Sequence, residues 1–364
     1  MIEHEINIKE KGLIKRLTNK TFQFDKRFKD GFYTANYFLK SQEIVVNNFK
    51  DNVVMMQFFQ RADNVHVCGL DECIALLKEF SPHPENLTVY ALNDGDLIQS
   101  GEPVLKIVGP YQDFGFLESA IDGILARRSS VCTNCFEVVK ACNGKKILNM
   151  ADRQDDPYTQ AGDGYAAYVA GMRFFSTDAQ CAWTNLKAGG TMPHALIALC
   201  NGDILKASDL YIKQFPNAPF TALIDYHNNV VWDTIKLADH LKEKLTSVRI
   251  DTSKALIDHY FDDKDTSGFD PHGVCKELVL ALRHELDIRG YNFVKIVVSS
   301  GFSLEKIKEF ERLNIPVDVY GIGTNLIKNW VGFTGDLVKV NGKDEAKEGR
   351  HEIFSSRLIE EKLV

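Results

Sequence analysis

The second half of the chain alternates short apolar runs with longer segments of helical periodicity, and this alternation restricts the fold more than any other feature. Strands that alternate with helices form a parallel sheet with right-handed crossovers. About six to eight such units within ~200 residues fit a closed (β/α) barrel, and an open doubly wound sheet is the alternative. The apolar runs are KILNMA (146–151), RFFSTD (173–178), TALIDY (221–226), SVRID (247–251), FVKIVVSS (293–300) and PVDVYGIG (316–323).

The first part of the chain has a different pattern. Helical periodicity covers 31–49 and 70–80, and apolar and polar residues then alternate between glycine-containing turns up to residue 111. We therefore predict an α/β protein in three parts. They are an N-terminal α+β module (1–115), an irregular (β/α) barrel that carries the active site (116–340) and a C-terminal segment that packs back on the N-terminal module (341–364).

Composition excludes several classes of protein. The chain has 364 residues and carries 43 Lys and Arg against 50 Asp and Glu, a net charge of −7. This acidic balance argues against a general nucleic-acid binder. No apolar run approaches the ~18–20 residues that span a bilayer, and the opening residues 1–12 are charged and lack the apolar core of a signal peptide. We expect a cytoplasmic protein with no membrane and no nucleic-acid partner.

The eight cysteines are too sparse for a disulfide framework in a chain of this length, so we expect free thiols in a reducing compartment. Cys132 and Cys135 form a CxxC pair, but no second pair stands at zinc spacing and the surrounding residues favour a helix. We therefore interpret both as buried packing residues and assign no residue as a metal ligand.

Each apolar run ends in polar or glycine residues. In a barrel, the carboxyl ends of all strands open on the same face, so these groups should converge on one site. A single Asp at a strand end is more often a cap for the following helix, but six polar strand ends in succession favour a shared site. The endings are 152–153, 177–178, 225–227, 249–251, 299–301 and 321–324.

Two glycine turns follow consecutive strands, SSGF at 299–302 and GIGT at 321–324. Glycine lets backbone N–H groups approach an anion, and the helix that follows adds the positive end of its dipole. Loops after the last strands of a barrel commonly hold a phosphate. Neither turn fits a nucleotide fingerprint, so we predict a phosphate site of another kind, with two ordinary tight turns as the alternative.

The segment GGTMPHALIALC (189–200) places His194 after two glycines and Thr191. A lone histidine is more often a structural hydrogen-bonding group than a catalyst. This one belongs to a glycine-rich, hydroxyl-bearing turn among polar strand ends, which suits a nucleophile or a phosphate neighbour.

Four segments in this order and spacing, GTMPHALI, VRIDTS, KIVVSSGF and DVYGIGTNL, resemble nicotinate phosphoribosyltransferase. The wider group is the type II phosphoribosyltransferases, which also contains the nicotinamide and quinolinate enzymes. The resemblance runs from about residue 34 to residue 340, where TGDLVKV resembles the closing segment of the family.

The resemblance implies an enzyme of NAD biosynthesis and salvage. Members transfer phosphoribosyl from phosphoribosyl pyrophosphate to a pyridine nitrogen and release pyrophosphate in the presence of Mg²⁺. It further implies ATP as co-substrate, with His194 as the histidine that ATP phosphorylates. It also implies a homodimer or higher homo-oligomer with shared active sites, in which Tyr37 stacks on the ring in the other subunit's site.

The resemblance also implies roles for the strand ends. Asp225 and Asp251 match acids near the ribose and pyrophosphate, while Arg249, Arg153 and Thr191 belong to substrate binding. The residues that match the 5′-phosphate loops are Ser300, Gly301, Gly321, Gly323 and Thr324.

Two residues depart from the family pattern. Ala35 stands where the stacking motif usually has Asp, and Asp178 stands where nicotinate-using members tend to carry a small hydroxyl or amide. An aspartate facing a pyridine carboxylate would meet like-charge repulsion, so Asp178 favours nicotinamide. The GTMPHAL segment and the chain length favour nicotinate, which we take as the substrate, with nicotinamide as the alternative.

Three other functions remain open. Quinolinate, with its second carboxylate, would call for more Arg and Lys at the strand ends. A non-catalytic phosphosugar-binding barrel would not need His194, Arg249 and Asp251 together. An aldolase of the same barrel class would need a strand-end lysine, for which Lys187 and Lys295 are the near candidates.

Overall fold

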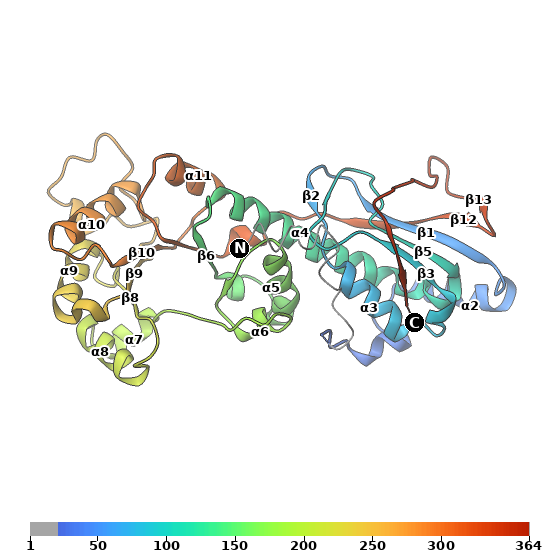
Figure 1. Ribbon diagram of the computed structural model, residues 1–364, viewed down its shortest axis with the longest axis horizontal. Helices are drawn as coiled ribbons and strands as arrows, with labels where there is room; N and C mark the ends of the chain where they lie inside the picture. The colour runs from blue at the N-terminus through green and yellow to red at the C-terminus, as the bar shows by residue number, and fades with distance from the viewer. Residues whose placement is uncertain (1–20, 364) are drawn as a thin grey trace.

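The computed structural model describes residues 21–363 and shows an elongated molecule made of two parts (Figure 1). One part is built on a six-stranded parallel sheet and the other on a six-stranded antiparallel sheet. The predicted α/β fold with an N-terminal module is confirmed. Our expectation about residues 1–12 concerns a segment outside the described residues.

All six apolar runs form strands of the parallel sheet, although the strands are shorter than the runs. Their order distinguishes a barrel from a doubly wound sheet, because β6 pairs with both its successor β7 and the last strand, β11. First and last strands pair in a barrel, whereas a doubly wound sheet keeps them apart. The order in the sheet is β7 (Phe174–Phe175), β6 (Lys146–Asn149), β11 (Val319–Ile322), β10 (Lys295–Val298), β9 (Ser247–Ile250) and β8 (Thr221–Leu223).

The barrel is open on one side. Within residues 21–363, no ladder joins β7 to β8, which form the two edges of the sheet. The chain between them contains only helices, α6 (Asp178–Cys181), α7 (His194–Leu199) and α8 (Ile204–Gln214). The sheet is therefore a curled partial barrel, which agrees with the irregular (β/α) barrel that we predicted.

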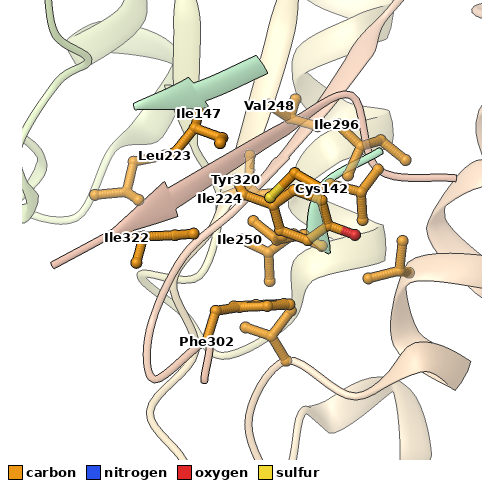
Figure 2. Packing of buried hydrophobic residues seen from close by; sticks show 14 of the residues in the cluster. Cys142, Ile147, Leu223, Ile224, Val248, Ile250, Ile296, Phe302, Tyr320 and Ile322 are labelled. Carbon is orange, nitrogen blue, oxygen red and sulfur yellow. The ribbon is translucent and has the colours of Figure 1, made fainter. Parts of the chain in front are cut away.

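Helices follow the strands and cover the outside of the sheet, as the alternation predicts. They are α5 (Gln160–Val169), α9 (Val230–Leu241), α10 (Lys276–Ile288) and α11 (Leu304–Arg312). Figure 2 shows strand side chains such as Ile147, Val248 and Ile296 packed around Tyr320. Tyr320 is fully buried and its hydroxyl donates to Glu311 Oε1 at 2.6 Å, so its one polar atom is satisfied.

The N-terminal module is an antiparallel sheet packed against helices α2 (Asn36–Asn48) and α3 (Leu70–Phe80). Strands β1 (Val53–Gln60), β5 (Leu105–Pro110) and β3 (Thr88–Ala91) supply its centre. A short two-stranded sheet of β2 (Val65–His66) and β4 (Leu97–Ile98) lies beside it. Phe58, Leu105 and Ile107 are among the fully buried residues of its core.

Three strands from the end of the chain complete this module. β12 (Phe333–Val340) pairs with β1, β13 (Lys343–Asp344) pairs with β12, and β14 (Ile359–Lys362) pairs with β3. Residues 333–340 thus lie in the N-terminal sheet, although we assigned them to the barrel. Pairing between strands far apart in the chain leaves no mark in local periodicity, so the sequence pattern could not place them.

Helix α4 (Glu118–Ala141) connects the two parts of the molecule (Figure 1). It packs on α3 and β12 in the N-terminal module and on α5 and α11 in the barrel part. Cys132 and Cys135 lie on it and are fully buried. Burial raises the pKa of Cys135 well above its usual value, which disfavours a thiolate. The pair packs in the core as predicted.

None of the helices in the described chain combines the length and the apolar character that a bilayer crossing requires.

Three carboxylates crowd the start of α4 and the neighbouring β12. Burial, together with Asp122 and then Asp336, raises the pKa of Glu118 to about 8. Burial also raises the pKa of Asp122 to about 6. Arg350 Nε lies 2.8 Å from Asp336 Oδ2 and is the cation of this group. The folded protein therefore holds protons that the unfolded chain releases at lower pH.

We predict that Glu118→Gln stabilises the protein above neutral pH. Between about pH 4.5 and 8 the unfolded chain ionises Glu118 while the folded state keeps it protonated, so the free energy of unfolding falls as pH rises. The substitution removes this loss, a gain of about 1–2 kcal/mol at pH 8 once solvent screening is allowed for. Urea unfolding at pH 5 and pH 8 measures it.

The exposed Glu243→Gln is the matched control, because it removes the same charge from a solvated surface. A gain for Glu118→Gln that is equal at pH 5 and pH 8 would contradict the prediction.

Candidate active site

The carboxyl ends of the parallel strands meet around a cavity of about 630 Å³. This is the convergence that the polar strand ends predict. Most of the predicted site residues line it, namely Arg153, Thr191, His194, Arg249, Asp251, Ser300, Gly301, Gly321, Gly323 and Thr324.

His194 is the first residue of α7, and the extended Pro193 that precedes it turns the ring into the cavity. Its Nε2 lies 3.1 Å from Oδ2 of Asp225, which follows β8. The Asp225 side chain is only 7% exposed, while that of His194 is 44% exposed. Burial raises the pKa of Asp225, and His194 opposes that rise. The pair is an accessible imidazole held by a buried carboxylate.

Arg249 and Asp251 stand at the end of β9, two residues apart and therefore on the same face of the strand. Arg249 is 9% exposed. Its Nη1 donates to Thr191 Oγ1 at 2.7 Å, and its Nη2 lies 3.6 Å from Asp251 Oδ2. Ser299 holds the other Asp251 oxygen at 2.5 Å. Burial lowers the pKa of Arg249, and Asp251 and Asp225 oppose this effect.

The two glycine turns border the cavity as close backbone approaches. Ser300 and Gly301 adopt φ values of +66° and +73°, in the left-handed region that favours glycine. A Cβ on Gly323 would lie 3.0 Å from the carbonyl oxygen of Met150, and one on Gly321 would meet Met150 Sδ at 2.6 Å. These turns therefore expose backbone rather than side chains to the cavity, as an anion site requires.

Arg153 reaches the cavity from a single 3₁₀ turn, Ala151–Arg153, directly after β6. The next residue, Gln154, accepts a hydrogen bond from Thr324 at 2.7 Å. This contact joins the turn after β6 to the turn after β11. It depends on the pairing of first and last strands.

Three predicted residues do not line the cavity. Asp225 is buried beside His194 and contacts its Nε2. Tyr37 is on α2, 64% exposed, at the other end of the molecule from β8, β9 and β10 (Figure 1).

Asp178 is exposed and opens α6, where it accepts from the backbone of Ala188 at 3.4 Å. The assignment of Asp178 to substrate binding therefore finds no support in the cavity lining. Thr177 and Gln180 form a capping box around it. The sequence TDAQ carried this signal, because Thr followed three residues later by Gln is a helix start.

Sequence reasoning missed several residues that line the cavity. Asp152 and Ser299 stand within the strand ends that we singled out, so neighbouring positions could have been included. Ser176 directly follows β7 and lines the cavity, but the prediction singled out the nearby Asp178 instead. The Ser176 hydroxyl donates to the carbonyl oxygen of Asn149 at 2.5 Å. Met192 and Asn325 carry no signal in the sequence that distinguishes them.

Comparisons with known proteins agree with this geometry. Residues 34–129 match the family described as quinolinate phosphoribosyl transferase, N-terminal domain. The structure of nicotinate-nucleotide pyrophosphorylase from Pyrococcus furiosus is 30% identical, with a TM-score of 0.78 over 93% of this chain and 82% of that chain. Human nicotinic acid phosphoribosyltransferase shares the fold at 18% identity, with a TM-score of 0.67 over 86% of this chain and 75% of that one.

Two curated relatives are more distant in sequence. A nicotinate phosphoribosyltransferase of Mycobacterium tuberculosis is 24% identical over 243 residues, which are 66% of this chain and 48% of that protein. The nicotinate phosphoribosyltransferase of Bacillus subtilis is 21% identical over 244 residues, 65% of this chain and 45% of that protein. The chain thus spans about half the length of the curated relatives it matches.

We predict that Thr191→Val destabilises the protein by about 1–3 kcal/mol, because it leaves a buried guanidinium N–H without an acceptor. Thr191→Ser keeps the hydroxyl and should remain near the wild type. Urea unfolding compares the two, and an equal loss in both would show that the Arg249 contact is not the cause.

Proposed function

This chain belongs to the nicotinate phosphoribosyltransferase family, within the type II phosphoribosyltransferases, and we propose that it transfers phosphoribosyl from phosphoribosyl pyrophosphate to nicotinate. The products are nicotinate mononucleotide and pyrophosphate, in NAD salvage. One observation carries the proposal: a single cavity joins the His194–Asp225 pair, the Arg249–Asp251 pair and two backbone turns shaped for an anion.

The reaction separates charge, and the cavity has groups for both signs. Breaking the bond between C1′ and pyrophosphate develops positive charge on the ribose and negative charge on the leaving group. Arg153 lines the cavity and can neutralise the pyrophosphate, while the Asp251 carboxylate can stabilise the ribose cation. The turns at 299–302 and 321–324 suit the 5′-phosphate. The pyridine nitrogen attacks with its own lone pair, so no general base is needed.

The residues present fit Mg²⁺ that is held mainly by substrate. Residues 21–363 contain no cluster of three or more metal-binding side chains, and protein-bound Mg²⁺ often uses one or two carboxylates together with substrate phosphates. Asp225 Oδ1 is buried and has no hydrogen-bond partner, so Asp225 and the neighbouring Asp251 are the carboxylates that we propose for it. When bound, Mg²⁺ would offset charge on the pyrophosphate.

His194 is placed to couple ATP hydrolysis to the transfer. Asp225 accepts a hydrogen bond from Nε2 and so orients the ring, with the other ring nitrogen left free to react. The other ring nitrogen can attack the terminal phosphate of ATP, forming a nitrogen–phosphorus bond and releasing ADP, and water later cleaves that bond. A phosphorylated His194 would place a dianion beside the pyrophosphate site and alter the affinity for pyrophosphate between steps.

Nicotinate suits the cavity better than nicotinamide does. Asp178, the residue that favoured nicotinamide, is exposed and outside the lining. Arg249, which also lines the cavity, offers a cation for a pyridine carboxylate. The eight cysteines are all free and buried, which supports a reducing compartment such as the cytoplasm.

A homo-oligomer with shared sites would account for Tyr37. No residue of α2 is buried, and Tyr37 cannot reach the cavity of its own chain because it lies at the opposite end of the molecule (Figure 1). We propose that it stacks on the pyridine ring in a second subunit's cavity. Tyr37→Ala should therefore raise the KM for the base, measured by pyrophosphate release.

We predict that the protein releases pyrophosphate from phosphoribosyl pyrophosphate only when a pyridine base is present, and faster with nicotinate than with nicotinamide. A coupled pyrophosphate assay with both bases measures this. Faster turnover with nicotinamide would reverse the substrate assignment. Absence of release with either base, combined with retained binding of phosphoribosyl pyrophosphate, would instead indicate a non-catalytic phosphosugar-binding barrel.

We also predict that radiolabelled ATP transfers an acid-labile phosphate to the protein and that His194→Ala abolishes the label. Phosphoramidate bonds at histidine hydrolyse in acid, whereas serine and threonine esters persist. His227→Ala is the matched control, since this neighbouring histidine also pairs with a carboxylate, Asp233 at 2.7 Å, but does not line the cavity. Label that survives in His194→Ala would exclude this residue.

A further inference from the structure

The Arg153 guanidinium has no partner within the described chain, although it lines the cavity. Its position is therefore set by the backbone that carries it. That backbone is fixed before Arg153 by Asn149 Oδ1, which accepts from Ala151 N at 3.0 Å. It is also fixed by Gln160 Nε2, which donates to the carbonyl oxygen of Asp152 at 2.9 Å.

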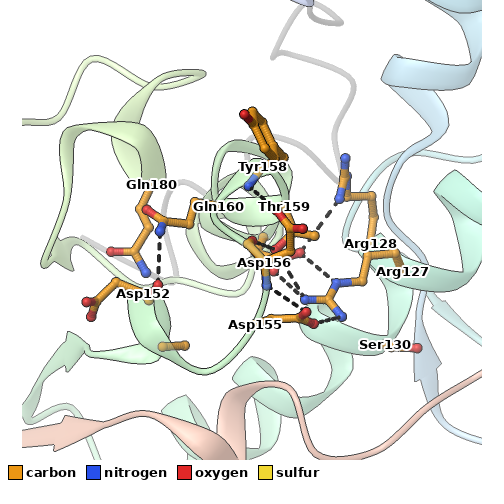
Figure 3. A network of polar contacts seen from close by, with 12 residues as sticks. Arg127, Arg128, Ser130, Asp152, Asp155, Asp156, Tyr158, Thr159, Gln160 and Gln180 are labelled. Carbon is orange, nitrogen blue, oxygen red and sulfur yellow. Dashed lines mark hydrogen bonds and ion pairs between the residues drawn. The ribbon is translucent and has the colours of Figure 1, made fainter.

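Beyond Arg153, the segment is held by Gln154, which accepts from Thr324 at 2.7 Å, and by one arginine on α4. Arg127 Nη1 lies 2.7 Å from Asp155 Oδ2, and Figure 3 shows the two side chains next to each other. The same guanidinium binds Asp163 of α5 through Nε at 2.9 Å and Nη2 at 2.6 Å. The Arg127 side chain is 18% exposed. Two ion pairs thus tie the segment and α5 to α4.

Arg127 itself is not among the residues that line the cavity. We propose that Arg127 is a positioning residue: through Asp155 it fixes the segment 151–156 on α4 and so holds the Arg153 guanidinium toward an anionic group of the substrate. The identity of that group rests on the proposed function, but the mechanical link does not. Arg127 acts only through the segment that it binds.

A different explanation is that the segment is held by its own turns. Asp155 Oδ1 accepts from Asp156 N at 2.7 Å, and Asp156 Oδ1 accepts from Tyr158 N at 2.8 Å. An asparagine at either position can still accept these bonds. Asp155→Asn and Asp156→Asn therefore keep both turns and remove the same charge, but only Asp155→Asn weakens the ion pair with Arg127.

Loss of the negative charge and loss of positioning also have opposite effects on the affinity for an anion. Loss of a negative charge near the cavity strengthens anion binding through the field alone. Loss of positioning weakens it, because Arg153 is no longer held in place. A weaker affinity in Asp155→Asn, with unchanged or stronger affinity in Asp156→Asn, can come only from positioning.

Hydrogen–deuterium exchange of the full-length protein is the first test, and it does not depend on activity. We expect faster exchange in peptides covering 151–156 for Asp155→Asn, unchanged exchange there for Asp156→Asn, and no change in α10 for either. Unchanged exchange in Asp155→Asn overturns the inference, whether or not the protein binds phosphoribosyl pyrophosphate.

Calorimetric binding of phosphoribosyl pyrophosphate with Mg²⁺ is the second test. We expect Asp155→Asn to weaken binding about 3- to 10-fold with a melting temperature near that of the wild type, and Asp155→Glu to recover most of the affinity. Failure of the wild type to bind would count against the proposed function alone. Wild-type binding that Asp155→Asn leaves unchanged or strengthens would overturn the positioning role.

Discussion

The hydrogen bonds between β6 and β11, the first and last strands of the parallel sheet, are the constraint on which the active site depends. Residues 319–322 pair with residues 146–149 in register, across nearly half of the chain. This register places the turn that carries Arg153 beside the turn that carries Gly323 and Thr324, and Gln154 then joins the two. A doubly wound order of the same strands would place these turns apart. The cavity is thus a consequence of barrel order, even though the barrel stays open between β7 and β8.

The charged side chains of the site form pairs, and each pair leaves one polar atom without a hydrogen-bond partner. Asp225 is buried and holds His194, yet one of its oxygens has no partner. Arg249 is bound by Thr191 and Asp251, yet its Nε has no partner. Unsatisfied buried polar atoms are costly in a stable core. The two such atoms on Asp225 and Arg249 stand at strand ends beside the cavity, which suits a site that binds a charged molecule. The net charge of −7 alone would argue against an anionic ligand.

Helix α4 gives the elongated molecule its continuity. Its first turn carries Glu118, next to the N-terminal sheet. Its middle carries Arg127, which binds Asp163 of α5, and Arg128, which binds Glu72 of α3. The N-terminal sheet in turn is completed by strands from the other end of the chain. The N-terminal module is therefore not a continuous stretch of sequence, whereas the parallel sheet is built from one stretch, 146–322. The segment next to the cavity is held from a helix that begins in the N-terminal module.

The sequence by itself determined the local elements and the chemistry of the strand ends. Periodicity identified all six parallel strands, because each is a short apolar run between amphipathic helices. The polar endings identified Arg153, Arg249 and Asp251 as convergent, and the glycine-rich turn at 189–194 added His194. Tertiary structure decided three things that periodicity cannot encode. They are the opening of the barrel between β7 and β8, the return of β12 to the N-terminal sheet, and the exclusion of Asp178 from the cavity. Each depends on which distant segments form hydrogen bonds with one another, and a residue's local pattern is the same whichever partner it meets.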